Sequence, residues 1–166
     1  RLDRPQRYSS LPPTLYGFIP QTYCGDEIAA FCKLRAGGTT KVERGDGDPI
    51  DICVLTEKDF GHGDFLIRAK PIGGLRMIDG GEADDKIVAV LAGDNIWGNV
   101  RDIADLPPIK TERLQHYFST YKMIPGKESN VKVDFVYGRE EALKVIAAAE
   151  RDYQNHYGHL HTQSKN

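Results

Sequence analysis

Residues 46–55 read Asp46-Gly47-Asp48-Pro49-Ile50-Asp51-Ile52-Cys53-Val54-Leu55, and they join an acidic turn to an apolar run. Gly47 lets the backbone turn freely, and Pro49 fixes a bend. The β-rich residues from Ile50 to Leu55 are typical of a strand. The stretch therefore predicts a strand that begins beside three closely spaced aspartates.

Similar short runs occur elsewhere, at residues 65–70, 75–78 and 86–91, and turns containing glycine separate them. Such spacing predicts a small barrel or curled sheet. The C-terminal third predicts a helix over residues 110–122, an alternating strand over 131–137, and a second helix whose apolar face is Ala142, Val145, Ile146, Ala149 and Tyr153. Residues 20–45 look like a long loop or insertion. We therefore expect one α+β domain over residues 1–166, with a β core and about two helices.

Composition excludes several classes of protein. The 166 residues are 40% hydrophobic and 28% charged, with a net charge of −2. This balance argues against a strongly basic nucleic-acid binder and against a disordered acidic chain. No apolar run approaches the roughly 18–20 residues of a membrane span. We therefore expect neither a nucleic-acid nor a membrane partner.

The three cysteines, Cys24, Cys32 and Cys53, include no Cys-x-x-Cys pair, and their number is odd. A disulfide framework or a zinc knuckle is therefore disfavoured, and we expect small buried side chains with reduced thiols in a cytoplasmic protein. The sequence begins at Arg1 in the middle of a pattern, so we also expect a segment upstream of it.

Two acidic windows stand out, at residues 43–51 and 79–86, and each holds four acids against one base. Closely spaced carboxylates repel and raise one another's pKa, and hard divalent cations are the usual remedy. Mg²⁺ takes oxygen ligands and prefers sites that substrate phosphates complete. The alternative is two solvated acidic turns. An EF-hand is rejected, because Asp51 stands where its loop needs glycine.

Basic side chains accompany the acids: Arg44 and Lys86 flank the two windows, Lys122 ends the first helix beside Tyr121, and Arg4 lies near the N-terminus. A lone lysine is more often a solvated surface residue. Taken together around paired carboxylates, these cations indicate a site that holds metals on one side and a phosphate-rich anion on the other.

The motifs resemble those of the soluble, family I inorganic pyrophosphatases. The signature is Asp-x-Asp-Pro-x-Asp, present at residues 46–51. Further segments match in order along the chain: Tyr16-Gly17-Phe18-Ile19, Lys70-Pro71-Ile72-Gly73-Gly74-Leu75, the acidic loop with Asp79, Asp84 and Lys86, and Tyr121-Lys122. The resemblance covers nearly all of residues 2–150.

The resemblance implies an OB-type five-stranded β-barrel with flanking α-helices, and Mg²⁺-dependent hydrolysis of pyrophosphate to two phosphates. By position, the metal ligands would be Asp46, Asp51, Asp79 and Asp84. Asp48 would be the general base on a metal-activated water, with no covalent intermediate. The phosphate-binding residues would be Arg4, Lys86, Tyr121 and Lys122, and Tyr16 would be a further active-site residue. The family also implies a homo-oligomer, a hexamer or a dimer.

The sequence departs from the family's pattern in three places. The family's early strands, which carry a lysine and glutamates of the site, have no counterpart here and are expected before Arg1. Pro12 stands where many members have a tyrosine, and residues 20–45 are longer than the link in compact bacterial members.

Other functions remain as alternatives. An OB-type module that binds oligonucleotides would need basic strand-end loops, and these loops are acidic. A nucleotide hydrolase would need an apolar slot that no motif identifies, and a structural metal site would not need Lys86 and Lys122. The histidines of His156-x-x-His159-x-His161 are either a transition-metal site or an ordinary polar tail. Trp97 either lines the site or packs in the core.

Overall fold

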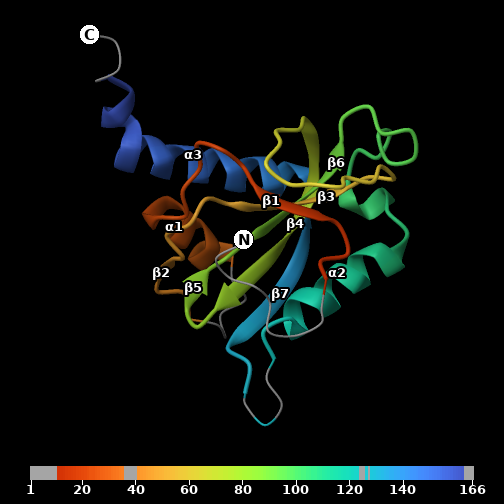
Figure 1. Ribbon diagram of the computed structural model, residues 1–166. Coiled ribbons are helices and arrows are strands. Elements are labelled where there is room, and N and C mark those ends of the chain that lie inside the picture. The colour runs from red at the N-terminus through yellow and green to blue at the C-terminus, as the bar shows by residue number, and fades with distance from the viewer. Residues whose placement is uncertain (1–10, 36–40, 124–125, 127, 163–166) are drawn as a thin grey trace.

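A computed structural model describes residues 11–35, 41–123, 126 and 128–162, and within these ranges it contains one mixed sheet of seven strands (Figure 1). The strands are β1 (Leu15–Phe18), β2 (Arg44–Gly45), β3 (Asp51–Leu55), β4 (Ala69–Asp79), β5 (Glu82–Ala83), β6 (Lys86–Leu91) and β7 (Val131–Gly138). Their order is β1-β3-β6-β4-β5-β2, and β7 also pairs with β4. The α+β class is confirmed, and this described part of the sheet is open rather than closed into a barrel.

The register of the central strands determines where the acidic windows and Lys86 lie. β3 and β6 run parallel, with Asp51 opposite Lys86, while β1 and β4 run antiparallel to them. All six residues of β6 are buried, as expected for a strand that is covered on both faces. The two acidic windows directly precede β3 and β6, so the parallel pairing brings both windows to the same edge of the sheet.

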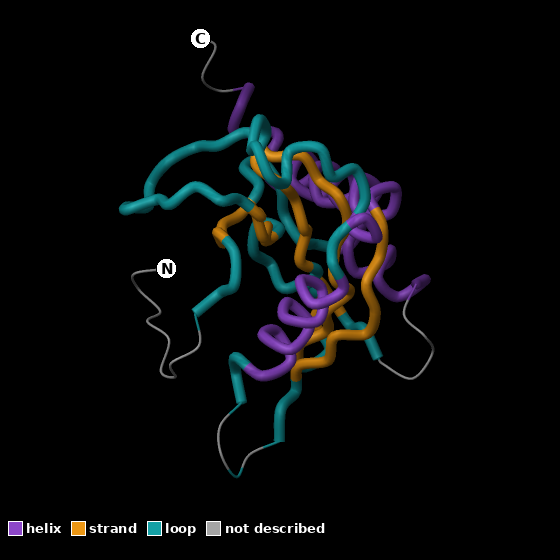
Figure 2. The backbone as a smooth tube through the Cα atoms, turned by 90° about the vertical axis from the view of Figure 1, so that its right-hand side faces the viewer, coloured by secondary structure: helices purple, strands orange, loops and turns teal. Residues whose placement is uncertain are grey.

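Helices cover both faces of the sheet (Figures 1 and 2). The helices are α1 (Asp26–Arg35), the 3-10 helix η1 (Ile103–Asp105), α2 (Pro108–Thr120) and α3 (Arg139–Thr162). On one face, α1 and α3 pack on a core that includes Ile78 and Ile87. On the other face, α2 packs on a core that includes Met77 and Val88. None of the described helices is apolar enough over a sufficient length to cross a membrane.

Several expectations are confirmed by the structure. The strands at residues 50–55, 86–91 and 131–137 correspond to β3, β6 and β7, and the two helices correspond to α2 and α3. All three cysteines are free and buried, as the cysteine pattern predicted. Trp97 packs against the core beneath α2, where Lys110 lies 4.9 Å from its ring, and it is not among the residues that line the cleft described below.

Other expectations are wrong. The loop expected at residues 20–45 contains α1, whose apolar contacts come from Ile28, Phe31 and Cys32 at helical spacing. The runs at 65–70 and 75–78 are not two strands, because β4 starts at Ala69 and continues through the glycine pair with a bulge between Pro71 and Gly73. Of the C-terminal histidines, His156 and His159 are exposed on the last turns of α3, as a polar tail would have them, although that tail is helical.

Candidate active site

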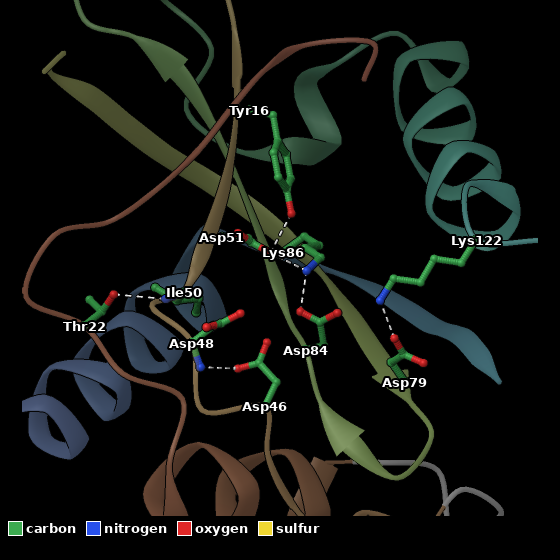
Figure 3. Close-up of polar contacts among 10 residues, drawn as sticks. All are labelled: Tyr16, Thr22, Asp46, Asp48, Ile50, Asp51, Asp79, Asp84, Lys86 and Lys122. Atoms are coloured by element: carbon green, nitrogen blue, oxygen red, sulfur yellow. Dashed lines mark hydrogen bonds and ion pairs between the residues drawn. The ribbon is translucent and has the colours of Figure 1, made fainter. Parts of the chain in front are cut away.

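Lys86 lies at the centre of the site, where β6 begins (Figure 3). The residue is 1% exposed, and its ammonium group forms ion pairs with Asp51, at 2.5 Å, and with Asp84. Burial alone lowers the pKa of Lys86, but the charges of Asp84 and Asp51 outweigh burial and hold that pKa well above its usual range. Lys86 is therefore a permanent positive charge within a set of carboxylates.

Tyr16 reaches the same group from β1. Its hydroxyl donates a hydrogen bond of 2.5 Å to Asp51 Oδ2, although the residue as a whole is 44% exposed. Burial is the main cause that raises the pKa of Tyr16, and the Asp51 carboxylate adds to it. The hydroxyl therefore remains protonated and acts as a donor that orients Asp51.

The loop before β3 carries Asp46 and Asp48. The backbone N–H of Asp48 donates to Asp46 Oδ1 at 3.0 Å, which fixes the Asp46 carboxylate against its own loop. Burial, together with the nearby charge of Asp84, raises the pKa of Asp46 to about 7. Burial also raises the pKa of Asp84, although Lys86 opposes that rise. Burial therefore disfavours the charged form of both carboxylates, and positive charge placed beside them would favour it.

A second cation closes the other side of the site. Lys122, just past the end of α2, forms an ion pair with Asp79 at the end of β4 (Figure 3). Burial lowers the pKa of Lys122, but the hydrogen bond to Asp79 outweighs burial and raises that pKa to about 12. Burial also raises the pKa of the neighbouring Tyr121, which keeps its hydroxyl protonated. Tyr121 and Lys122 line the cleft from the α2 side, where the Lys122 ammonium group contacts Asp79.

One cleft brings together nine of the ten residues expected in the site: Tyr16, Asp46, Asp48, Asp51, Asp79, Asp84, Lys86, Tyr121 and Lys122. The tenth, Arg4, lies outside the described residues. Arg44 is directed instead toward Glu82, which it contacts at 2.6 Å, and Arg44 is not among the residues that line the cleft.

Residues outside the predicted site set also line the cleft. Glu82 lines it from β5, and Phe118 lines it from α2. The ring of Phe118 lies 6.1 Å from that of Tyr16 and 5.8 Å from the Lys86 ammonium group. Phe118 belongs to the buried apolar face of α2, but helical periodicity alone does not say which residues that face contacts.

The described residues contain no group of three or more histidine, cysteine, aspartate or glutamate side chains already arranged to hold a metal ion. The carboxylates nevertheless fit hard cations by their chemistry. Five aspartates of the acidic motifs place carboxylate oxygens around one cleft, and burial raises the pKa of Asp46 and Asp84, a shift that added positive charge would offset. Among the C-terminal histidines whose side chains are described, His156 stacks on Tyr23 with ring centres 4.8 Å apart.

Fold and site together define an α+β protein with an acidic, lysine-flanked cleft at one edge of its sheet. The family model described as inorganic pyrophosphatase matches residues 1–154. The chain therefore belongs to the inorganic pyrophosphatase family, which confirms the resemblance seen in its motifs.

Individual relatives agree with the family match. The chain is 46% identical to the inorganic pyrophosphatase of Chlamydia caviae over 164 residues, which cover 95% of this chain and 74% of that protein. It is 38% identical to soluble inorganic pyrophosphatase 2 of Chlamydomonas reinhardtii, covering 94% of this chain and 69% of that one. The crystal structure of the inorganic pyrophosphatase from Thermus thermophilus superposes with a TM-score of 0.72 at 30% identity, covering 93% of this chain and 77% of that one.

Proposed function

We propose that the cleft is the active site of a Mg²⁺-dependent inorganic diphosphatase that hydrolyses pyrophosphate to two phosphates. One observation carries the proposal: the family's acidic motifs, from separate parts of the chain, meet in a single cleft around the buried Lys86. Pyrophosphate is small and highly charged, so its hydrolysis depends mainly on charge neutralisation and positioning. The cleft supplies groups for both tasks.

Four aspartates would hold the divalent cations: Asp46, Asp51, Asp79 and Asp84. When bound, Mg²⁺ neutralises phosphate charge and lowers the pKa of a coordinated water toward neutrality. The chain's own groups prepare the ligands. The Tyr16 hydroxyl orients Asp51, and the Asp48 amide orients Asp46. Lys86 holds Asp51 and Asp84 at one end of the cleft.

Asp48 is the general base of the proposed reaction. Its carboxylate accepts a proton from the attacking water, which adds to one phosphorus while the other phosphate departs from the opposite side. The Pro49 bend and the hydrogen bond from the Asp48 amide to Asp46 fix the backbone at this position. No covalent nucleophile takes part, so water attack in a single step accounts for both products.

The cationic and phenolic groups bind the two phosphates. Lys86 and Lys122 stabilise the charge on the transferred and departing groups, and the Tyr121 hydroxyl donates a hydrogen bond without adding charge. We also assign Arg4 to phosphate binding, on family position alone. A cytoplasmic location, a single domain over residues 1–166, and assembly into a hexamer or a dimer remain predictions, as does the absence of nucleic-acid and membrane partners.

Phosphate release tests the proposed function. The chain, and a version extended upstream, are incubated with pyrophosphate and either Mg²⁺ or EDTA. ATP serves as the competing substrate, because a nucleotide hydrolase would prefer it. We expect release from pyrophosphate only with Mg²⁺. Faster release from ATP than from pyrophosphate, or no release by either protein, would contradict the proposal.

A further inference from the structure

Asp152, which lies on α3 and is not among the residues that line the cleft, holds the N-terminal end of α1. It is 5% exposed, and its two carboxylate oxygens accept three backbone N–H groups. These donors are Gly25 at 2.9 Å, Glu27 at 3.0 Å and Ile28 at 3.0 Å. Free N–H groups at a helix start carry partial positive charge, so a buried carboxylate binds them strongly. Asp152 therefore fixes the position of the chain just before α1.

The segment before α1 is also hydrogen-bonded to the loop that carries Asp46 and Asp48. The amide of Cys24 donates to the Asp48 carbonyl at 2.9 Å, and the Gly47 amide donates to the Cys24 carbonyl at 3.0 Å. The two backbones touch so closely that a Cβ on Gly45 would lie 2.1 Å from the Cys24 carbonyl oxygen. Only glycine fits at residue 45, and Gly47 has the positive φ of 76° that glycine favours.

Two further bonds tie this segment to its surroundings. The Ile50 amide donates to the Thr22 hydroxyl at 3.0 Å (Figure 3), and the Tyr23 amide donates to the Ala149 carbonyl of α3 at 3.0 Å. Residues 22–25 are thus bonded to α3 on one side and to the aspartate loop on the other. A continuous path of hydrogen bonds runs from α3 to the backbone of Asp48.

We propose that Asp152 is a positioning residue for the Asp46–Asp48 loop. It acts through the two backbone hydrogen bonds that Cys24 makes with Gly47 and Asp48, which we call the Cys24 clamp. The proposal rests on the proposed function for its catalytic consequence, whereas the clamp itself exists without metal or substrate. It also gives α1 and the segment before it a role: they connect α3 to the loop that carries the general base.

Asp152→Asn is the direct test, because it keeps the side chain's size while placing an amide NH₂ against backbone donors. Amide hydrogen exchange is measured by NMR without metal. We expect exchange at Cys24 and Gly47 to accelerate at least about 10-fold relative to Val88 in the sheet core. In steady-state assays we expect kcat to fall at least about 10-fold and the KM for pyrophosphate to change less than about 2-fold, because displacement of the base affects the chemical step.

Glu150→Gln, on the exposed face of the same helix, is the matched control and should behave as wild type. If Asp152→Asn does not fold, Asp152→Glu, which keeps the charge but displaces it, replaces it in the same measurements. Unchanged exchange at Cys24 and Gly47, or unchanged kcat, overturns the proposal. If the wild-type chain itself does not hydrolyse pyrophosphate, the proposed function fails, and hydrogen exchange alone decides whether the clamp exists.

Discussion

Arg76→Met would remove a charge that is fully buried on the α1 and α3 face of the sheet. The Arg76 side chain is 0% exposed, and its Nε donates to both oxygens of Asp85, at 2.9 and 3.0 Å. Its guanidinium carbon lies 5.4–5.6 Å from the ring centres of Phe31, Phe135 and Tyr137. Methionine fills similar space without charge, so the variant leaves the Asp85 carboxylate buried with only the Tyr137 hydroxyl, at 3.0 Å, as its side-chain donor.

The expected loss in the free energy of unfolding is about 3–5 kcal/mol, the usual cost of leaving one partner of a buried ion pair uncompensated. For a domain of this length, each kcal/mol lowers Tm by about 2–4 °C, so the expected fall is about 6–20 °C. Burial already raises the pKa of Asp85 to about 6, against the opposing charge of Arg76. Without Arg76 that pKa rises further, and the variant protonates Asp85 more readily than the wild type does. The stability gap should therefore be smaller at pH 6 than at pH 8.

Urea and thermal unfolding, followed by circular dichroism in EDTA, measure the loss. The double variant Arg76→Met with Asp85→Asn removes this pair of charges and leaves a carbonyl oxygen to accept from Tyr137; Glu141, 3.5 Å from Arg76, keeps its ion pair with Arg35. It should recover to within about 1.5 kcal/mol of wild type, because neutral replacement of a buried pair is often tolerated. A single variant that loses less than about 1 kcal/mol, or a double variant no more stable than the single one, would refute the argument.

Three further changes test other parts of the molecule. Lys122→Ala should raise the KM for pyrophosphate about 10-fold while changing the half-saturating Mg²⁺ concentration less than about 2-fold. Lys41→Ala, which changes an exposed ion-paired lysine, is the control. Equal changes in both constants would place Lys122 outside the phosphate site. Tyr16→Phe should lower kcat about 10-fold by removing the donor to Asp51, and an unchanged kcat would show that this hydrogen bond is not needed. Hydrogen bonds, chiefly from the Trp97 amide, lower the pKa of Asp94 to about 2 from 3.8. The Asp94 carboxylate therefore stabilises the fold above about pH 4, and this stabilisation is lost as the pH falls toward 2. The gap in urea midpoint between wild type and Asp94→Asn should therefore shrink between pH 5 and about pH 2.5, and a constant gap would contradict this.

Strong local patterns predicted most of the sheet and two of the helices. Ile87, Val88, Ala89 and Val90 form a continuous apolar run, which is what a strand covered on both faces requires. Helix α1 was missed because its few apolar contacts lie among alanines and charged residues, so its periodicity is weak. The continuity of β4 was missed because Gly73 and Gly74 resemble a turn. Both glycines instead permit close packing, since an added Cβ at either would lie 2.5 Å from Tyr137.

The sequence predicted which residues would line the cleft, but not the hydrogen bonds and ion pairs that connect them. Motif order placed Asp51, Asp84 and Lys86 in one site, and the parallel pairing of β3 with β6 brings them together. The motif resemblance selected Asp84, which lines the cleft, but nothing in the sequence indicated that Asp85 is buried against Arg76 on the opposite face. Nor did it indicate Asp152, because that residue reaches the loop only through tertiary hydrogen bonds between distant segments.

Turnover of pyrophosphate by Asp48→Asn, beside wild type at saturating Mg²⁺, tests the central claim most directly. The substitution removes a base and changes almost no volume, so the unfolding midpoint should stay within experimental error. We predict that kcat falls by about 10²–10⁴-fold, the range that general-base catalysis contributes. Turnover within about 2-fold of wild type would contradict the role of Asp48 and the mechanism built on it.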